Sequence, residues 1–278
     1  MVRSIRREYK VETERLRHPG DVVAERYEII EFVGVGSFAE VFRSLDRTLN
    51  REVAIKLMRV RTMIKPGLDA AEVHRKLRER FAREAAAVAK LNDPYTVTLF
   101  DSGSDRGGDL YMAFEFIPGS NLRDYVAQHG KLSPERVVKV LQQALSSLRE
   151  AHVHGLMHRD IKPENLMIFD SLGQKDQIRV VDFGIAKAFE DQASALTAAG
   201  QIVGTPRYVS PERVYQKDLI PASDLYSLGA VAYFLLLGEE VYTETKSPVE
   251  LIKRHASPEP ITIPQRYNIP DGLRVIVE

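Results

Sequence analysis

Four polar side chains close together in the sequence could transfer a phosphoryl group. Asp160, Lys162 and Asn165 fall within six residues, and a second acid, Asp182, follows in Asp182-Phe183-Gly184. The Asp160 carboxylate could take a proton from an attacking hydroxyl, and the Lys162 ammonium could neutralise a phosphoryl group in transit. Asn165 and Asp182 offer oxygen ligands of the kind that Mg²⁺ prefers. In such a reaction the protein supplies position and charge rather than covalent chemistry.

The composition limits the other possibilities. The chain has 278 residues, of which 44% are hydrophobic, enough for one large or two small domains with a real core. Lys+Arg and Asp+Glu both number 39, so bulk charge gives no reason to expect nucleic acid or a membrane surface as a partner. The absence of cysteine excludes disulfides and a catalytic thiol, which fits a cytoplasmic protein. The longest apolar run, at 229–237, is too short to span a bilayer, and the basic start lacks the apolar part of a signal peptide.

The run from His158 to Asn165, His-Arg-Asp-Ile-Lys-Pro-Glu-Asn, resembles the catalytic loop of the eukaryotic-type (Hanks-type) serine/threonine protein kinases. A lone His-Arg-Asp would fit an ordinary surface turn, but the fixed offsets of Lys162, Asn165 and Asp182 favour the kinase interpretation. The resemblance implies an α+β fold in two lobes. We expect a flexible arm over 1–25, a β-rich N-lobe over about 26–117 and a mainly helical C-lobe over about 118–278. The wording Tyr-Val-Ser-Pro-Glu at 208–212 favours a bacterial member.

A glycine-rich stretch follows the first expected strand, which covers 27–33. Glycines let a hairpin backbone approach phosphates closely, so that its N–H groups can bind the anion. Another strand follows rather than a helix, which disfavours a dinucleotide-binding fold. The third glycine of the kinase family is Ala39 here, a mild change. The hairpin residues expected to bind ATP are Gly34, Val35, Gly36, Ser37, Phe38, Ala39 and Val41.

The resemblance assigns further nucleotide contacts. Lys56, in Val-Ala-Ile-Lys, matches the lysine that grips the α- and β-phosphates. Glu84, in a helix expected over 69–91, matches the glutamate that pairs with this lysine. The remaining positions are a gatekeeper (Phe114), backbone contacts to adenine (Glu115, Ile117), a ribose contact (Asn121) and side chains that sandwich the ring with Val41 (Ala54, Met167); taken singly, Ala54 and Met167 would count as core residues. The implied cofactors are ATP and Mg²⁺, with Mn²⁺ as an alternative.

The histidines of the C-lobe allow two interpretations. His152, His154 and His158 could suggest zinc, but no carboxylate motif of the zincin type accompanies them. The resemblance favours His158 as a core residue beneath Phe183, stacked with Val88 and Leu99. It also makes Asp224 the helix-borne acid that anchors the catalytic-loop backbone.

The stretch between Asp182 and Glu212 resembles an activation segment. Thr205 matches the threonine that contacts the catalytic aspartate in serine/threonine kinases. Thr197 is the first candidate phosphosite and Ser194 the second, with Arg159 as the partner of the phosphate and a kinase–kinase dimer as the route of autophosphorylation in trans. The arginine that pairs with the equivalent of Glu212 in the family has no match here. We therefore expect the C-terminal end of the domain to be missing, with Arg254 or Arg266 as a substitute partner.

The expected function is transfer of the ATP γ-phosphoryl group to Ser or Thr hydroxyls of protein substrates. Two alternatives remain at this stage. The first is a pseudokinase that binds nucleotide or partners without catalysis, although every catalytic position is filled. The second is a small-molecule phosphotransferase with a kinase-like fold, which would usually lack the Lys-Pro-x-Asn run.

Overall fold

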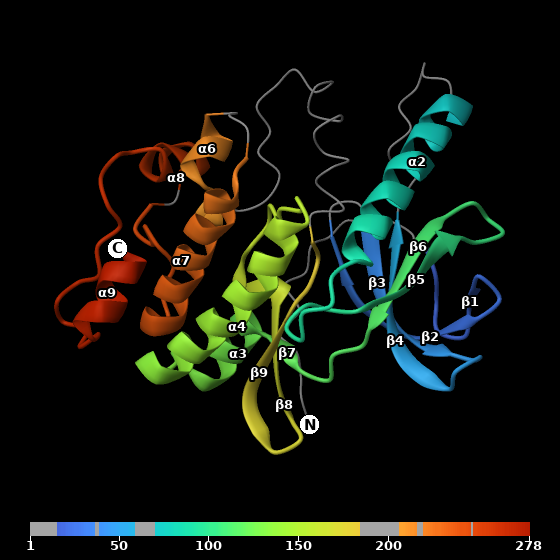
Figure 1. The fold of residues 1–278 in the computed structure, drawn as a ribbon, viewed down its shortest axis with the longest axis horizontal. Helices are drawn as coiled ribbons and strands as arrows, with labels where there is room; N and C mark the ends of the chain where they lie inside the picture. Colours follow the sequence, from blue (N-terminus) through green and yellow to red (C-terminus); the bar gives the residue numbers. More distant parts are fainter. Residues whose placement is uncertain (1–15, 37–38, 59–69, 184–205, 216–218, 246) are drawn as a thin grey trace.

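The computed structural model describes residues 16–36, 39–58, 70–183, 206–215, 219–245 and 247–278, and the structure is discussed for those residues. Two lobes lie side by side (Figure 1). The N-lobe, drawn on the right, combines a β-sheet with one long helix, and the C-lobe, on the left, is mainly helical. This arrangement confirms the two-lobed α+β fold that the sequence predicts.

The N-lobe sheet has six antiparallel strands in the order β1-β2-β3-β4-β6-β5. Its strands are β1 (Val22–Val23), β2 (Tyr27–Val35), β3 (Ala39–Asp46), β4 (Arg51–Met58), β5 (Leu99–Ser104) and β6 (Leu110–Glu115). Between β3 and β4 the Asp46 carboxylate accepts the N–H groups of Thr48 and Leu49, and Asn50 takes a left-handed conformation with φ of 49°. This local bonding closes the turn that brings the two strands together.

Both faces of the sheet are covered. Successive side chains of a strand point to opposite sides, so each strand contributes residues to two apolar clusters. On one face Phe42, Val53, Ile55 and Leu57 are fully buried in a cluster with Tyr27 and Tyr111. On the other face Met58, Met112 and Phe114 pack with α2 (Ala70–Val88) through Phe81, Ala85 and Val88. The second cluster continues into the C-lobe, where it includes Phe183 and Leu228, so one apolar core spans both lobes.

The C-lobe is built around two helices, α4 (Pro134–Val153) and α7 (Pro221–Leu237). The buried residues of α4 recur every three or four positions, as expected for one buried face, whereas α7 is apolar on nearly all sides and lies in the centre. Gly238 ends α7 with φ of 76°, a left-handed conformation that glycine adopts without strain. The other helices are α3 (Leu122–His129), α6 (Pro211–Val214), α8 (Pro248–His255) and α9 (Asp271–Val277). None of the helices in the described ranges combines the length and apolar character that a membrane crossing requires.

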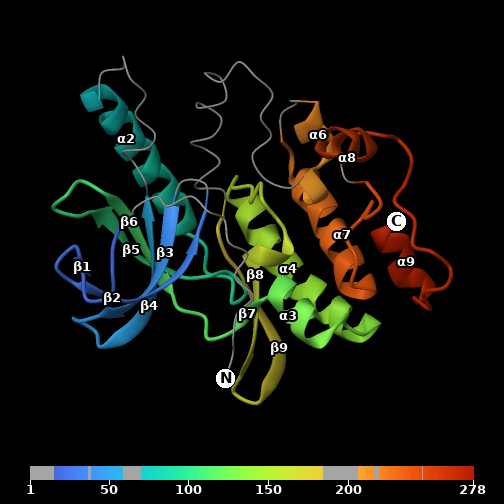
Figure 2. The ribbon, with the colours of Figure 1, turned by 180° about the vertical axis from the view of Figure 1, so that it is seen from behind.

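A small sheet lies beside the helices of the C-lobe (Figure 1). It contains β7 (Ser120–Asn121), β8 (Leu166–Ser171) and β9 (Gln174–Val180), with β8 in the middle. The β8–β9 turn consists of Leu172 and Gly173, both at positive φ, which matches the twist of a two-residue hairpin. Figure 2 shows this hairpin from behind, beside α3 and α4. Two short 3₁₀ helices, η1 (Pro163–Asn165) and η2 (Pro206–Tyr208), complete the described elements.

The ordered N-lobe begins earlier than the sequence predicts. Residues 16–25, expected to belong to a flexible arm, lie against the sheet: β1 pairs with β2, Val23 is fully buried, and Leu16 packs on the Phe42 cluster. Arg17 adds ion pairs with Asp105 and Asp109 to these contacts. The mostly polar composition of the segment gave no sign that it packs on the sheet.

Candidate active site

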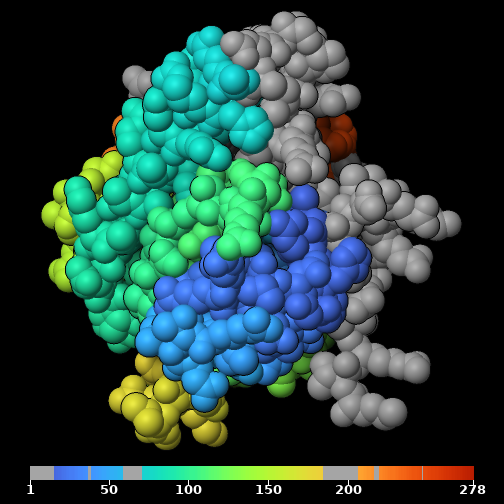
Figure 3. Space-filling model, turned by 90° about the vertical axis from the view of Figure 1, so that its right-hand side faces the viewer, coloured from blue at the N-terminus to red at the C-terminus, as the bar shows by residue number. Residues whose placement is uncertain are grey.

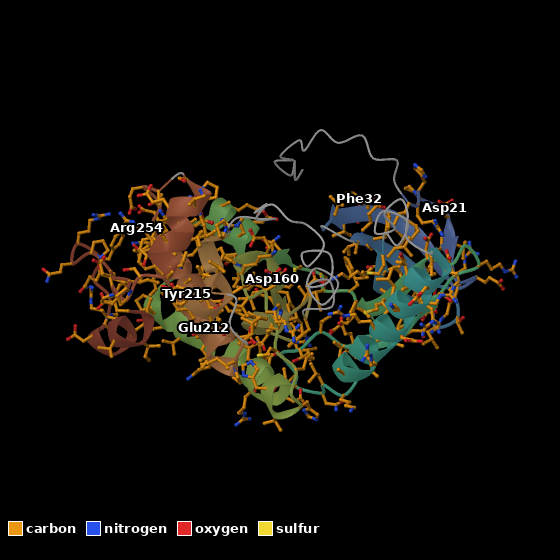
Figure 4. The ribbon with its side chains drawn as sticks, turned by 90° about the horizontal axis from the view of Figure 1, so that it is seen from above. Asp21, Phe32, Asp160, Glu212, Tyr215 and Arg254 are labelled. Carbon is orange, nitrogen blue, oxygen red and sulfur yellow. The ribbon has the colours of Figure 1, made fainter. Side chains whose placement is uncertain are left out.

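Asp160 lies between the two lobes (Figure 4) and is held from two sides. The Lys162 ammonium is 2.9 Å from its Oδ2. The side-chain amide of Asn165 donates to the Asp160 backbone oxygen at 2.8 Å and to Oδ2 at 3.2 Å. Figure 4 shows Asp160 near the middle of the molecule, with Phe32 on the N-lobe side and Glu212 on the C-lobe side. The three residues that could handle a hydroxyl, a phosphoryl group and a metal therefore meet at one point.

Burial and charge act in opposite directions on Lys162. Burial would lower the pKa of its ammonium, but the Asp160 carboxylate outweighs this effect and raises the pKa above the ordinary lysine value. Lys162 is therefore a cation at neutral pH, as neutralisation of a phosphoryl group requires.

The backbone of the catalytic loop is held in an unusual conformation. Arg159 has φ of 64°, in the left-handed region, which costs ~1–3 kcal/mol for a residue with a side chain. The Asp224 carboxylate on α7, which is 2% exposed, accepts the N–H groups of both His158 and Arg159 at 2.8 Å. Arg213 also donates to the Arg159 carbonyl at 2.7 Å. The predicted anchoring role of Asp224 is thus visible in its contacts.

His158 is a buried structural residue. Its ring centroid lies 4.7 Å from that of Phe183, and its Nε2 donates to the Val181 carbonyl at 2.9 Å. Burial lowers its pKa, and Nδ1 accepts the N–H of Asp160 at 3.2 Å, so the neutral ring uses both nitrogens. His152 contacts Asp224 and His154 contacts the Glu150 carbonyl, so the three histidines have separate structural roles.

Four of the expected nucleotide residues, Val41, Ala54, Lys56 and Phe114, share one face of the N-lobe sheet, while Met167 lies on β8 of the small sheet. Strand register places Val41 opposite Lys56 and Ala54 opposite Phe114. Gly36 donates its N–H to the Ala39 carbonyl at 2.8 Å, which forms a tight hairpin, while Ser37 and Phe38 lie outside the described residues. Phe114 is 7% exposed, and the side chains of Val41, Ala54 and Met167 are half-buried, which leaves an apolar surface for a flat ring. Gly34 and Val35 end β2, Glu115 ends β6, and Ile117 follows two residues later.

Asn121 has a local role that the sequence did not reveal. Its side chain caps α3 by accepting the N–H of Asp124 at 2.9 Å and donating to the Asp124 carboxylate at 2.9 Å. A contact with ribose would have to share or replace these bonds.

The expected ion pair between Lys56 and Glu84 is not formed. The Lys56 ammonium instead contacts Oδ1 of Asp182 at 2.8 Å, and Glu84 lies 3.5 Å from Arg80 on its own helix. Among the described residues, Oε2 of Glu84 is buried without a hydrogen-bond partner. The predicted Lys56–Glu84 pair was wrong because the partner of Lys56 depends on how α2 is placed against the sheet. The sequence of α2 does not specify that placement.

The two acids have different protonation behaviour as a result. Burial, only partly offset by Arg80, raises the pKa of Glu84 to about 7. Burial also opposes ionisation of Asp182, but Lys56 outweighs it and lowers the pKa of that carboxyl. Asp182 is therefore ionised at neutral pH, as a metal ligand must be.

Asn165 and Asp182 fit a hard divalent cation such as Mg²⁺. The described residues contain no cluster of three or more His, Cys, Asp or Glu side chains that could hold a metal by themselves. Mg²⁺ is commonly held by one or two protein oxygens together with water and substrate phosphates. The donor set here, one carboxylate and one amide, matches that pattern.

Sequence reasoning missed an ion network beside the catalytic loop. Arg123 on α3 pairs with Glu164 in η1 and with Glu240, the latter at 2.6 Å, and donates to the Tyr208 hydroxyl at 2.9 Å. Arg207 pairs with the other oxygen of Glu240 at 2.6 Å. Glu164 stood inside the recognised motif, but nothing in the pattern of α3 indicated Arg123 as its partner.

The activation-segment candidates Ser194, Thr197 and Thr205 lie outside the described residues. At the described end of this segment the Glu212 carboxylate accepts the Ser223 hydroxyl at 3.2 Å. Neither expected substitute pairs with Glu212 in the structure: Arg254 contacts Glu244 at 2.7 Å, and Arg266 lies over the ring of Tyr267.

Comparison with known proteins shows the family of the chain. Residues 27–274 match the protein kinase domain family. The chain is 35% identical to the serine/threonine-protein kinase pkn3 of Myxococcus xanthus over 87% of its length, and 35% identical to the serine/threonine-protein kinase PknB of Mycobacterium tuberculosis over 88%. A probable serine/threonine-protein kinase of Corynebacterium efficiens is 37% identical. The chain spans 36–43% of the length of these relatives. It therefore belongs to the protein kinase domain family and resembles its eukaryotic-type serine/threonine members from bacteria.

Proposed function

We propose that this protein transfers the γ-phosphoryl group of ATP to serine or threonine hydroxyls of other proteins. The observation that carries the proposal is the contact of Lys162 and Asn165 with one carboxylate, that of Asp160, in the same part of the molecule where Lys56 of the N-lobe contacts Asp182. A protein that binds nucleotide without catalysis would have no use for an ammonium and an amide that both contact the Asp160 carboxylate.

Each side chain has a role in the proposed reaction. Asp160 orients the acceptor hydroxyl and accepts its proton, while Lys162 offsets charge on the transferring phosphoryl group. The sheet face with Val41, Ala54 and Phe114 holds the adenine, and the N–H groups of the 34–39 hairpin bind phosphate oxygens. Asn165 and Asp182 would hold Mg²⁺, which would neutralise phosphate charge when bound.

The Lys56–Asp182 contact supports an inactive arrangement of the site. The Lys56 ammonium binds the carboxylate that is also the expected metal ligand, so the two cations would compete for it. Movement of α2 that brings Glu84 to Lys56 would free Asp182 for metal binding. Phosphorylation at Thr197 or Ser194, in trans within a kinase–kinase dimer, is the proposed trigger, with Arg159 as a partner for the phosphate.

The decisive experiment compares wild type with Asp160→Asn, using labelled ATP, Mg²⁺ and a generic protein acceptor. We expect phosphoserine or phosphothreonine from wild type and a fall in kcat of ~10²–10⁴-fold in Asp160→Asn. ATP affinity should remain, because Asp160 contacts the acceptor rather than the nucleotide. Asp271→Asn on α9 is the control, since it removes an exposed carboxylate at the far end of the C-lobe (Figure 1).

Two results would contradict the proposal. Nucleotide binding without phosphate transfer to any protein would support a pseudokinase. Transfer to small-molecule hydroxyls alone would support a phosphotransferase of kinase-like fold.

A further inference from the structure

The segment ahead of the family match is built into the nucleotide-binding lobe. The match begins at Tyr27, yet the described chain contacts the sheet from Leu16 onward. Arg26 closes the segment by pairing with Asp46, whose side chain is fully buried, at 2.7 Å. The segment 16–26 therefore has fixed contacts at both of its ends.

Glu40 carries the first contact. This residue of β3 is 0% exposed and shares its face with Phe42, in the apolar cluster that includes Leu57 and Tyr111. A buried carboxylate in such surroundings needs hydrogen-bond donors. The backbone N–H of Leu16 donates to its Oε2 at 3.0 Å, and the Leu16 side chain packs on the same cluster.

Arg17 carries the second contact. Its guanidinium pairs with Asp105 and, at 3.2 Å, with Asp109, two aspartates of the β5–β6 turn whose side chains are each 7% exposed. Asp105 also accepts the backbone N–H of Asp109 at 3.0 Å, so a hydrogen bond within the turn links the two acids independently of Arg17. Arg17 is thus fixed between two shielded carboxylates.

Together these contacts form a brace across one end of the sheet. Register aligns Glu40, Leu57, Tyr111 and Gly103 in one row across four strands. Leu16 binds at the Glu40 end of the row, and Arg17 binds just beyond the Gly103 end. Figure 3 shows the blue N-terminal part of the lobe next to the green β5–β6 hairpin. Two consecutive residues therefore connect strands at opposite sides of the row.

The brace acts next to the expected phosphate-binding hairpin. Glu40 lies between Ala39, whose carbonyl closes the hairpin by accepting the Gly36 N–H, and Val41, which faces the adenine side. Glu40 is covalently linked to Ala39 and Val41, so a shift of its backbone moves both neighbours, whose side chains point to the opposite face of the sheet. We propose that Arg17 is a positioning residue, which holds Leu16 on Glu40 and so fixes the hairpin in the geometry that binds nucleotide. The proposal rests on the proposed function, since it assigns the brace to the same ATP site.

The first test measures binding of a fluorescent ATP analogue with Mg²⁺. Arg17→Met should weaken binding by about 5-fold, the lower end of usual couplings between separate sites. Arg17→Lys should recover part of the loss, and the KM for ATP should rise more than kcat falls. The matched control is Arg47→Met, which removes an exposed ion pair with Glu28 on the same sheet. If Arg17→Met does not fold, Asp109→Asn replaces it.

The second test needs no nucleotide. Amide hydrogen exchange at Gly36 and over residues 39–42 should be faster in Arg17→Met than in Arg47→Met. Unchanged exchange would overturn the brace, and faster exchange with unchanged nucleotide affinity would overturn its positioning role. A wild-type protein that binds no nucleotide would instead contradict the proposed function, and exchange would still decide whether the brace holds the hairpin.

Discussion

At the residue scale, the nearest cation separates the protonation behaviour of two acids, Asp182 and Glu84. Asp182 faces Lys56 and has a lowered pKa, whereas Glu84 lies on α2 with its pKa raised to about 7 by burial. Only 18% of the Glu84 side chain is exposed, and its partner Arg80 is 3.5 Å away. We therefore expect Glu84 to change its protonation near neutral pH.

This shift predicts a pH-dependent stability. Between its unfolded pKa of 4.5 and its folded pKa of about 7, Glu84 holds a proton in the folded protein that the unfolded chain releases, so the free energy of unfolding falls as pH rises. Glu84→Gln stays neutral and should gain up to about 3 kcal/mol relative to wild type between pH 4 and pH 8. Melting temperatures across this range measure the effect. Glu79→Gln, an exposed carboxylate on the same helix, is the control, and a parallel profile for both variants would show that Glu84 titrates normally.

At the scale of elements, a side chain of α4 completes the outer edge of β9. Gln143 is 4% exposed; its Nε2 donates to the Asp176 carbonyl at 2.8 Å and its Oε1 accepts the Ile178 N–H at 3.0 Å. The amide thus replaces the neighbouring strand that an edge strand lacks. Since β9 leads into Asp182, this contact helps to place the acid that we propose as a metal ligand.

The contact predicts a large difference between two adjacent glutamines. Gln143→Leu keeps the volume but leaves the buried Ile178 N–H and the partly buried Asp176 carbonyl without this partner, at a cost of roughly 2–3 kcal/mol in the free energy of unfolding. Gln142→Leu changes an exposed neighbour and should cost little. Urea denaturation of both variants makes the comparison. Equal stabilities would mean that water replaces the amide at the strand edge.

Local patterns predicted the elements, but contacts between elements stayed hidden. The strand expected at 27–33 is β2, and the helix expected over 69–91 is α2, because periodicity is a local property. Family motifs also placed His158 beneath Phe183 and Asp224 under the catalytic loop, as the structure confirms. The Lys56–Asp182 pair could not be predicted, because it joins residues of two lobes. Gln143 gave no signal, since a lone glutamine on a helix has many possible partners.

At the scale of the whole molecule, three sets of polar contacts among the described residues connect the lobes, in addition to the shared apolar core. Lys56 of the N-lobe contacts Asp182 of the C-lobe, and Arg179 of β9 lies 3.3 Å from Glu115 at the end of β6. The third set involves residues 92–97, which lead from α2 to β5 yet bind the C-lobe. There the Val97 N–H donates to the Val180 carbonyl at 3.0 Å, and the Thr96 hydroxyl lies 2.6 Å from that of Ser147. In the proposed movement of α2, this loop would stay bound to the C-lobe.

Glu150 of α4 binds two backbone N–H groups at the start of this loop. Its carboxylate accepts the N–H of Asn92 at 2.9 Å and that of Asp93 at 2.8 Å. Glu150→Ala should release both amides to water and cost about 1–2 kcal/mol in the free energy of unfolding, since water partly replaces a half-exposed acceptor. Amide exchange over 92–97 should become faster, while exchange in the centre of α7 should be unchanged. Arg149→Ala, an exposed neighbour on the same helix, is the control. If exchange over 92–97 stays at the wild-type rate in Glu150→Ala, the remaining contacts of the loop are enough to hold it: those of Asp93 with Ser146, of Thr96 with Ser147, and of Tyr95 and Val97 with Val180.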